Sequence, residues 1–338
     1  MRRLIVIVSS ILIFAVIVYR FQGGSSKEMS RFEPHMIAHC VGRNTINLPE
    51  EFQRASIITG RFKSLEATVQ DPFFEVIVNE NKFTKRSFLN EIERRRSELK
   101  ENSDGAVNAF RYEKVLGDDA LIFRVQRIDD AYVSEINFLR GTSLVTVKMD
   151  SFRNQYVAAE ESLSKFALAF KENAIGHLGQ KSPNFCLGSV EIVGNFKEES
   201  GSFLFKEGDE ADFEVEINTY IPNASEPLLA RMSGPDSLLK MFDVNHKVLR
   251  SGERKVVSMR AQEWLGWAKL SDEEGAKSFK FALETMRPKP SKAMPSINLT
   301  FNTGKPLPGG GAAKTILSDE EAVQIWDKVV SSIQSTAL

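Results

Sequence analysis

The sequence predicts an α+β protein made of two similarly built domains, each a mainly antiparallel sheet with helices on one side. The first observation is a repeated string. "HCVGRNTINLP" and "FCLGSVEIVG" hold the two cysteines of the chain, Cys40 and Cys186, each followed by an aliphatic residue and a glycine. A length of 338 residues also suits two domains better than one. We therefore expect each string to mark the first strand of one domain.

The second observation is that both halves end in the same way. The apolar, β-branched run at 144–149 precedes a helical pattern over 157–171, and the run at 296–301 precedes one over 317–333. Ser318 and Glu321 have the spacing of a capping box at the start of the second helix. Each half thus runs from a Cys-x-Gly strand to a strand followed by a helix.

Strand signals dominate between these ends. Residues 211–220, "ADFEVEINTY", alternate apolar and polar side chains, as a strand with one buried and one wet face does. Helices are expected at 85–100 and 225–232. Glycines and a proline interrupt the helical pattern between residues 173 and 184, which predicts a linker there. The expected domains are 40–178 and 183–336.

The N-terminus predicts a membrane anchor. Residues 4–19 carry no charge and follow Arg2 and Arg3. As a helix this run would span about 24 Å of a hydrocarbon core of about 30 Å. No small-residue cleavage site follows, so residues 1–23 are interpreted as an uncleaved signal anchor and 24–39 as a tether. The flanking arginines favour an inner-membrane protein with its body in the periplasm, or a periplasmic protein if the segment is cleaved.

Export would place the two cysteines in an oxidising compartment, where they can form a disulfide. Two readings of Cys40 and Cys186 stay open on this evidence. Either they pair with each other and join the two domains, or each is a small buried residue at equivalent places in two related domains.

The chain offers no constellation that points to catalysis. The formal net charge of −1 argues against nucleic-acid binding, and no cofactor or small-molecule substrate is indicated. The arginine run within 94–96 is interpreted as a solvated helix face, because glutamates surround it. His35, His39 and Cys40 could ligate a metal, but no fourth ligand is visible, so no metal site is predicted. The glycine-rich stretch 304–315 lacks the phosphate-loop pattern.

Several segments resemble a known family. They are "CVGRNTINLP", "CLGSVEIVG", "VLRSGERKVVSMRAQEW" and above all "PSINLTFNTG" followed by "LSDEEAVQIWDKVVSSI". Together they resemble the type VI secretion immunity proteins that are cognate to the fourth class of Tle phospholipase effectors. The resemblance runs from Cys40 to Ile333 and is weakest over residues 60–115. It implies a two-domain α+β protein of the periplasm that binds an antibacterial lipase and blocks it without turnover. It assigns no contact residue.

The physical reading and the resemblance lead to the same expectation. An exported, anchored body without catalytic groups is expected to bind a protein partner, and the resemblance names that partner as a cognate lipase effector. Two other interpretations were weighed. One is a membrane-anchored scaffold or sensor without a toxin partner, and the other is an envelope enzyme whose site the sequence does not reveal.

Overall fold

The computed structural model describes most of the chain after residue 33. The described residues are 34–65, 73–103, 108–117, 119–173, 183–220, 226–233, 246–269, 277–286, 289–304, 315 and 317–336. The predicted anchor, residues 1–23, and most of the tether fall outside them. None of the helices in the described ranges has the length and apolar character that a membrane span requires. The body from His35 to Leu338 forms one compact unit.

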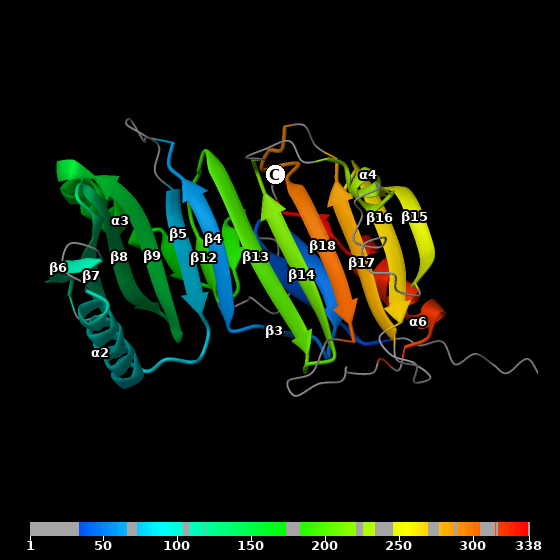
Figure 1. Ribbon diagram of the computed structural model, residues 1–338, viewed down its shortest axis with the longest axis horizontal. Helices are drawn as coiled ribbons and strands as arrows, with labels where there is room; N and C mark the ends of the chain where they lie inside the picture. The colour runs from blue at the N-terminus through cyan, green and yellow to red at the C-terminus, as the bar shows by residue number, and fades with distance from the viewer. Residues whose placement is uncertain are drawn as a thin grey trace, which may run out of the picture. The chain divides into compact units, whose positions relative to one another are not determined.

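A single thirteen-stranded sheet runs through this body (Figure 1). The first half of the chain supplies β3 (Gln53–Arg54), β4 (Ile57–Lys63), β5 (Phe73–Asn79), β6 (Ala109–Val115), β7 (Ala120–Ile128), β8 (Ala131–Arg140) and β9 (Ser143–Phe152). The second half supplies β13 (Glu198–Glu207), β14 (Ala211–Asn218), β15 (His246–Val256), β16 (Met259–Lys269), β17 (Lys277–Thr285) and β18 (Ser296–Thr303). All pairings are antiparallel, so the expected α+β class with mainly antiparallel sheets is confirmed.

The two halves share one strand order. From the centre outward, the first half runs β4-β5-β9-β8-β7-β6, and the second runs β13-β14-β18-β17-β16-β15. Strands β4 and β13 pair with each other and join the two sets edge to edge. This pairing removes two exposed edges that would otherwise invite aggregation. The predicted linker falls largely on residues 174–182, outside the described residues, so the domain ranges 40–178 and 183–336 remain a prediction.

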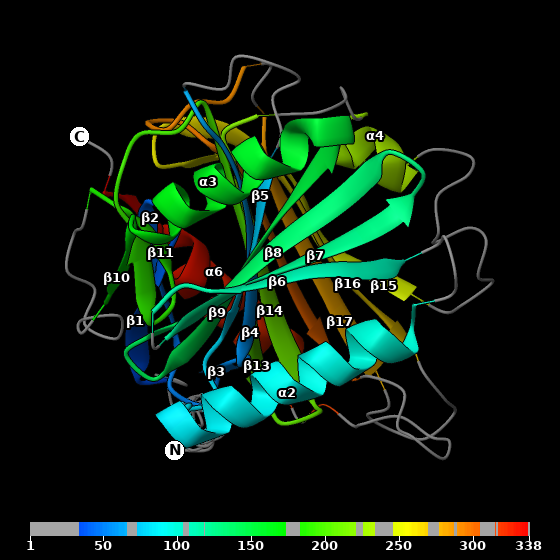
Figure 2. The same cartoon turned by 90° about the vertical axis from the view of Figure 1, so that its left-hand side faces the viewer.

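Helices cover both faces of the sheet, which corrects the expectation of helices on one side. The helices are α2 (Lys85–Glu101), α3 (Tyr156–Ala167), α4 (Leu228–Ser233) and α6 (Asp319–Ser331), with a 3-10 turn at Arg153–Gln155 before α3. On β7, Phe123 packs in the cluster that contains α2, whereas the adjacent Ile122 packs in the cluster that contains α3. Successive strand residues point to opposite faces, so α2 and α3 lie on opposite sides, as Figure 2 shows. The near-continuous apolar run at 120–123 is the sequence signal of a strand buried on both faces.

The helix boundaries follow local chemistry. The predicted capping box is confirmed, because the Ser318 hydroxyl accepts from the Glu321 amide at 3.1 Å and the Glu321 carboxylate accepts from the Ser318 amide at 2.9 Å. Helix α3 ends at Ala167, earlier than expected, and Phe170 belongs to the short strand β10 (Phe170–Glu172).

The Cys-x-Gly strings form a layer of two small sheets on the α3 and α6 side of the large sheet. One contains β1 (Met36–Val41), β2 (Asn44–Pro49) and β19 (Gln334–Ser335), and the other β10, β11 (Phe185–Leu187) and β12 (Val190–Ile192). Gly42 and Gly188 make the two turns with φ of +60° and +71°, a conformation that favours glycine. Strand β1 begins at Met36, so the fold starts four residues before Cys40, the predicted start of the first domain.

Candidate functional site

The face of the large sheet that carries α2 and α4 has a central stretch that no described helix covers (Figure 1). We call this stretch the open face. It consists of the side chains of β5, β4, β13, β14 and β18 that point away from the main core. Their alternate neighbours, such as Phe62, Phe203 and Phe301, are fully buried in that core. The open face is therefore the wet side of a half-buried antiparallel sheet.

The centre of the open face is a hollow of about 410 Å³. Both halves line it, with Thr59, Arg61, Glu75 and Lys148 from the first and Ser200, Ser202, Glu216, Asn218 and Tyr220 from the second. In the pairing of β4 with β13, Arg61 lies opposite Ser200 and Thr59 lies opposite Ser202. The short side chains of Thr59, Ser200 and Ser202 leave the seam between the halves hollow.

Exposed charges border the hollow. The Arg61 guanidinium lies 3.6 Å from the Glu75 carboxylate, and the two side chains are 48% and 55% exposed. Arg61 also lies over the Phe73 ring, 4.4 Å from its centroid. An exposed ion pair of this kind adds little to stability. Its groups remain available to a partner, and arginine and aromatic residues are enriched in the centres of protein interfaces.

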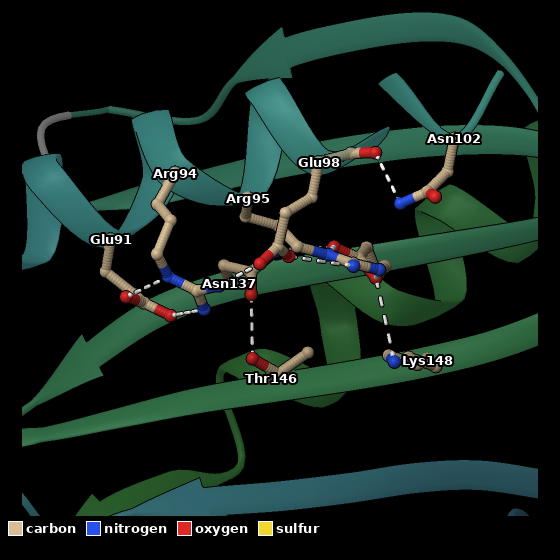
Figure 3. Close-up of polar contacts among 9 residues, drawn as sticks. Glu91, Arg94, Arg95, Glu98, Asn102, Asn137, Thr146 and Lys148 are labelled. Carbon is tan, nitrogen blue, oxygen red and sulfur yellow. Dashed lines mark hydrogen bonds and ion pairs between the residues drawn. The ribbon is translucent and has the colours of Figure 1, made fainter. Parts of the chain in front are cut away.

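A partly buried ion pair fixes α2 to the sheet beside the open face (Figure 3). Arg95 donates from Nε and Nη2 to the two carboxylate oxygens of Glu135 on β8, both at 2.8 Å. The hydrogen bonds to Glu135 raise the pKa of Arg95 and outweigh its burial, so the guanidinium stays charged. Lys148 on β9 lies 3.9 Å from the same carboxylate. The helix is thereby held in one position on this side.

The predicted solvated face of α2 is correct for Arg94 and wrong for Arg95 and Arg96, because Arg96 pairs with Glu113 on β6. Arg94 pairs along the helix with Glu91 and Glu98, three and four residues away (Figure 3). Arg95 reaches the sheet instead. The sequence could not distinguish them, because neighbouring helix positions point about 100° apart and the position of the sheet was unknown.

The second half contributes carboxylates and amides to the open face. Asp212, Glu214 and Glu216 alternate along β14, and they lie opposite Asn302, Thr300 and Asn298 of β18. The Asn302 amide donates to Asp212 at 2.8 Å, and the Asn298 amide donates to Glu216 at 3.4 Å. Glu214 is exposed. This side of the open face is therefore rich in hydrogen-bond acceptors.

Helix α4 stands at the outer border of that acceptor-rich side. The Gln262 side-chain oxygen on β16 accepts from the Leu229 amide at 3.0 Å, and Arg231 pairs with Glu284 on β17. The open face thus lies between α2 of the first half and α4 of the second.

The sequence-predicted candidates lie elsewhere. Cys40 and Cys186 meet in the layer of small sheets as a disulfide, with Cα atoms 6.0 Å apart. His35 contacts Glu50 at 3.1 Å, and the His39 ring packs 4.9 Å from the ring of Phe205. Within the described ranges, no group of three or more His, Cys, Asp or Glu side chains could hold a metal ion. The glycine-rich stretch 304–315 falls largely outside those ranges.

Sequence reasoning identified one strip of the open face without assigning it a role. The alternation in 211–220 marked Glu214, Glu216 and Asn218 as wet. The pairing of β4 with β13, which builds the central hollow, has no local sequence signal. Its central pair, Arg61 and Ser200, joins residues 139 positions apart in the chain (200 − 61).

Comparison with known proteins identifies the second half. Residues 180–335 match the family model described as the Tle cognate immunity protein 4 C-terminal domain. These residues are similar to that C-terminal domain. The matched segment comprises β11 to β19, with α4 and α6. The resemblance predicted from the sequence is thereby confirmed.

Solved structures extend the similarity to the whole body. The apo structure of the immunity protein TplEi of the T6SS from Pseudomonas aeruginosa matches with a TM-score of 0.65 at 18% identity, over 89% of this chain and 97% of that one. The crystal structure of a Tle4-Tli4 complex contains a chain that matches with a TM-score of 0.65 at 19% identity, over 89% and 98%. At these identities the likeness concerns the fold. No curated protein gave a significant sequence match.

Proposed function

We propose that this chain is an immunity protein that binds and inhibits a cognate type VI secretion lipase effector in the periplasm and so protects the cell that makes it. Three findings support the proposal. Residues 180–335 match the model of the Tle cognate immunity protein 4 C-terminal domain. The fold is that of the immunity protein TplEi and of a chain in the Tle4-Tli4 complex. The open face presents polar and charged groups suited to contact with a protein.

The observation that carries the proposal is the central hollow, because both halves line it. Neutralising a toxin requires nanomolar or tighter binding, about −12 kcal/mol. Interfaces of that quality bury about 1,600 Å² in total, which is more than a hollow of this size offers. The effector would therefore contact the hollow together with the surfaces around it, from α2 to α4. Inhibition follows from occupation of the effector surface, with no turnover by this chain.

The proposal includes a membrane anchor at residues 1–23, with the body in the periplasm. The uncharged run at 4–19 supports it, as does the disulfide between Cys40 and Cys186, which suits an oxidising compartment. A tethered inhibitor would meet a lipase at the bilayer that the lipase attacks. Tethering also raises the local concentration of the inhibitor there.

Inhibition of a neighbouring lipase tests this function. The full chain is purified and titrated against the lipase encoded by the adjacent gene, with release of acyl chains from phospholipid vesicles as the readout. We expect activity to fall to background at one inhibitor per lipase. Undiminished lipase activity at a tenfold excess of the chain would contradict the proposal, and acyl release by the chain alone would favour an enzyme.

A further inference from the structure

A second hollow lies on the opposite face of the sheet from the open face, beside α3. It has a volume of about 580 Å³, within the range of small-molecule sites. Its lining includes Phe74, Ser151, Ala158, Ser162, Phe166 and Phe196. The lining residues on α3 and at its two ends recur every three or four positions from 155 to 169. The hollow is thus a groove along one side of the helix, about 20 Å long at 1.5 Å per residue. We call it the α3 groove.

The aromatic end of the α3 groove is apolar. Phe74 of β5 stacks on Phe166 of α3 with ring centroids 4.2 Å apart, and Phe196 meets Phe166 edge to face at 5.5 Å. Phe74, Phe166 and Phe196 are themselves buried, so their rings form a fixed floor. This end can hold hydrocarbon.

Small side chains keep the middle of the groove open. Helices α3 and α6 occupy matching places in the two halves, and a constant offset of 163 aligns the buried Ala159 with Ala322 and Leu163 with Trp326. At this offset Ser162 of α3 corresponds to Ile325 of α6, which is only 4% exposed. The second half therefore places an isoleucine where the first half has a serine.

The other end of the groove carries a polar group without a partner. Ser151 on β9 is 5% exposed, and its hydroxyl makes no hydrogen bond within the part of the chain that the structure describes. A buried hydroxyl left unpaired is costly, so it marks a place where a ligand acceptor would be stabilised. Asp150 lines the groove only through its backbone, because its side chain alternates with Ser151 and points to the opposite face.

The start of α3 reinforces this polar end. No side chain caps the helix at Gln155, and its first turn holds no acidic residue. The 3-10 turn Arg153–Gln155 leads directly into α3 and also lacks a side-chain cap, so the positive dipole end of this helical stretch begins just after Ser151 in the chain. These two features together favour a negatively charged group.

We propose that the α3 groove binds a single-chain lipid with an anionic head, placing the head at Ser151 and the start of α3 and the acyl chain along Ala158, Ser162 and the phenylalanine floor. A narrow groove about 20 Å long suits one extended chain. An extended peptide fits less well, because its amides would need partners that the walls do not supply. The α3 backbone is hydrogen-bonded within the helix, so its amides and carbonyls are not free to pair with those of a peptide.

Two molecules share this chemistry, a free fatty acid and an anionic lysophospholipid. Hydrolysis of one ester bond of a phospholipid, with addition of water, releases both. The inference rests on the α3 groove alone and does not depend on the proposed binding of a lipase.

Binding of cis-parinaric acid, a fatty acid whose fluorescence rises in apolar surroundings, tests the proposal on the full chain. Ser162→Ile introduces the residue found in α6 and should weaken binding roughly tenfold by filling the groove. Ser164→Ile is the matched control, since Ser164 lies on the same helix but does not line the groove. Lipid binding by the uncharged segment 4–19 would be the same in both variants, so it would not affect their comparison. Equal affinities of the two variants and the wild-type chain would overturn the proposal.

The position of the head is tested separately. Ser151→Ala should weaken binding roughly tenfold to a hundredfold, the cost of one hydrogen bond to a charged group. Ser134→Ala, which removes another buried hydroxyl outside the groove, should leave binding unchanged.

Competition then identifies the source of the ligand. Displacement of the probe by palmitate alone assigns a free fatty acid, and displacement by lysophosphatidylglycerol assigns a lysophospholipid. The anionic head would be refuted if uncharged monopalmitin displaced the probe as effectively as palmitate does. The lipid site itself would be refuted if none of the three compounds displaced the probe.

Discussion

Gly60 of β4 and Gly201 of β13 lie directly opposite each other at the seam between the two halves. Each half contributes one of these glycines from its innermost strand, β4 in the first half and β13 in the second. A Cβ on Gly60 would lie 2.9 Å from the Ser200 carbonyl oxygen, and a Cβ on Gly201 would lie 2.9 Å from the Phe203 ring and 3.2 Å from the Phe185 ring. The glycines therefore let the layer of small sheets pack closely on the seam.

Gly60→Ala is expected to lower the free energy of unfolding by about 1–3 kcal/mol, because the new methyl group meets backbone rather than a movable side chain. Urea unfolding monitored by tryptophan fluorescence measures the change. Thr59→Ser, on the adjacent residue facing the hollow, serves as the control and should stay within about 0.5 kcal/mol of the wild-type chain. Equal stability of Gly60→Ala and the control would show that the seam can relax.

The Cys40–Cys186 disulfide is expected to form in the periplasm and to stabilise the body by about 3–5 kcal/mol, since it closes a loop with a sequence separation of 146. Mass analysis of the chain after alkylation, with and without reductant, checks the bond. The double variant Cys40→Ser/Cys186→Ser should match the reduced wild-type chain in its urea midpoint. A fully alkylated chain isolated from the periplasm without reductant would contradict the prediction.

Arg95→Ala should destabilise the body by about 2 kcal/mol, because it strips the main partner from Glu135, whose side chain is 2% exposed. Arg94→Ala provides the comparison on the same helix. Its pairs are exposed, so a change within about 0.5 kcal/mol is expected. Thermal unfolding of both variants measures the two losses of stability. Similar losses would contradict the prediction that the pair of Arg95 with Glu135 stabilises the fold more than the exposed pairs of Arg94 do.

Asp319, at the start of α6, should make stability depend on pH. Burial opposes its ionisation, but hydrogen bonds from Lys277, Lys247 and Trp267 outweigh that effect and lower its pKa. A lowered folded-state pKa gives stability that is complete above the unfolded value of about 4 and is lost as the pH falls through the folded value.

Asp319→Asn should therefore cost about 1–2 kcal/mol at pH 7 and progressively less below pH 4. Urea unfolding at a series of pH values from 7 to 3 provides the measurement. A cost that stays constant down to pH 3 would point to packing rather than charge.

The sequence predicted the elements with strong local signals. The Ser318–Glu321 capping box and the alternation around Val215 each depend on neighbouring residues, and both were correct. The repeated Cys-x-Gly string also predicted a strand at each cysteine, and these strands are β1 and β11.

Features set by distant residues could not be predicted. The pairing of β4 with β13 depends on edge complementarity between strands far apart in the sequence, and the contact of Arg95 with Glu135 depends on where α2 docks. Both the central hollow and the α3 groove arise from such long-range packing. The face covered by α2 was also missed, although the apolar pair Ile122 and Phe123 pointed to a strand buried on both sides.

Affinity of the neighbouring lipase for open-face variants tests the central claim most directly. Ser202→Trp would fill the central hollow, whereas Lys171→Trp adds the same bulk on β10, in the layer of small sheets. Calorimetric titration of the full chain with the lipase gives the dissociation constants. The account predicts nanomolar binding for the wild-type chain and Lys171→Trp, and roughly a hundredfold loss, about 2.7 kcal/mol, for Ser202→Trp. Unchanged binding by Ser202→Trp, with a large loss for Lys171→Trp, would place the interface on the other side of the sheet and contradict the account.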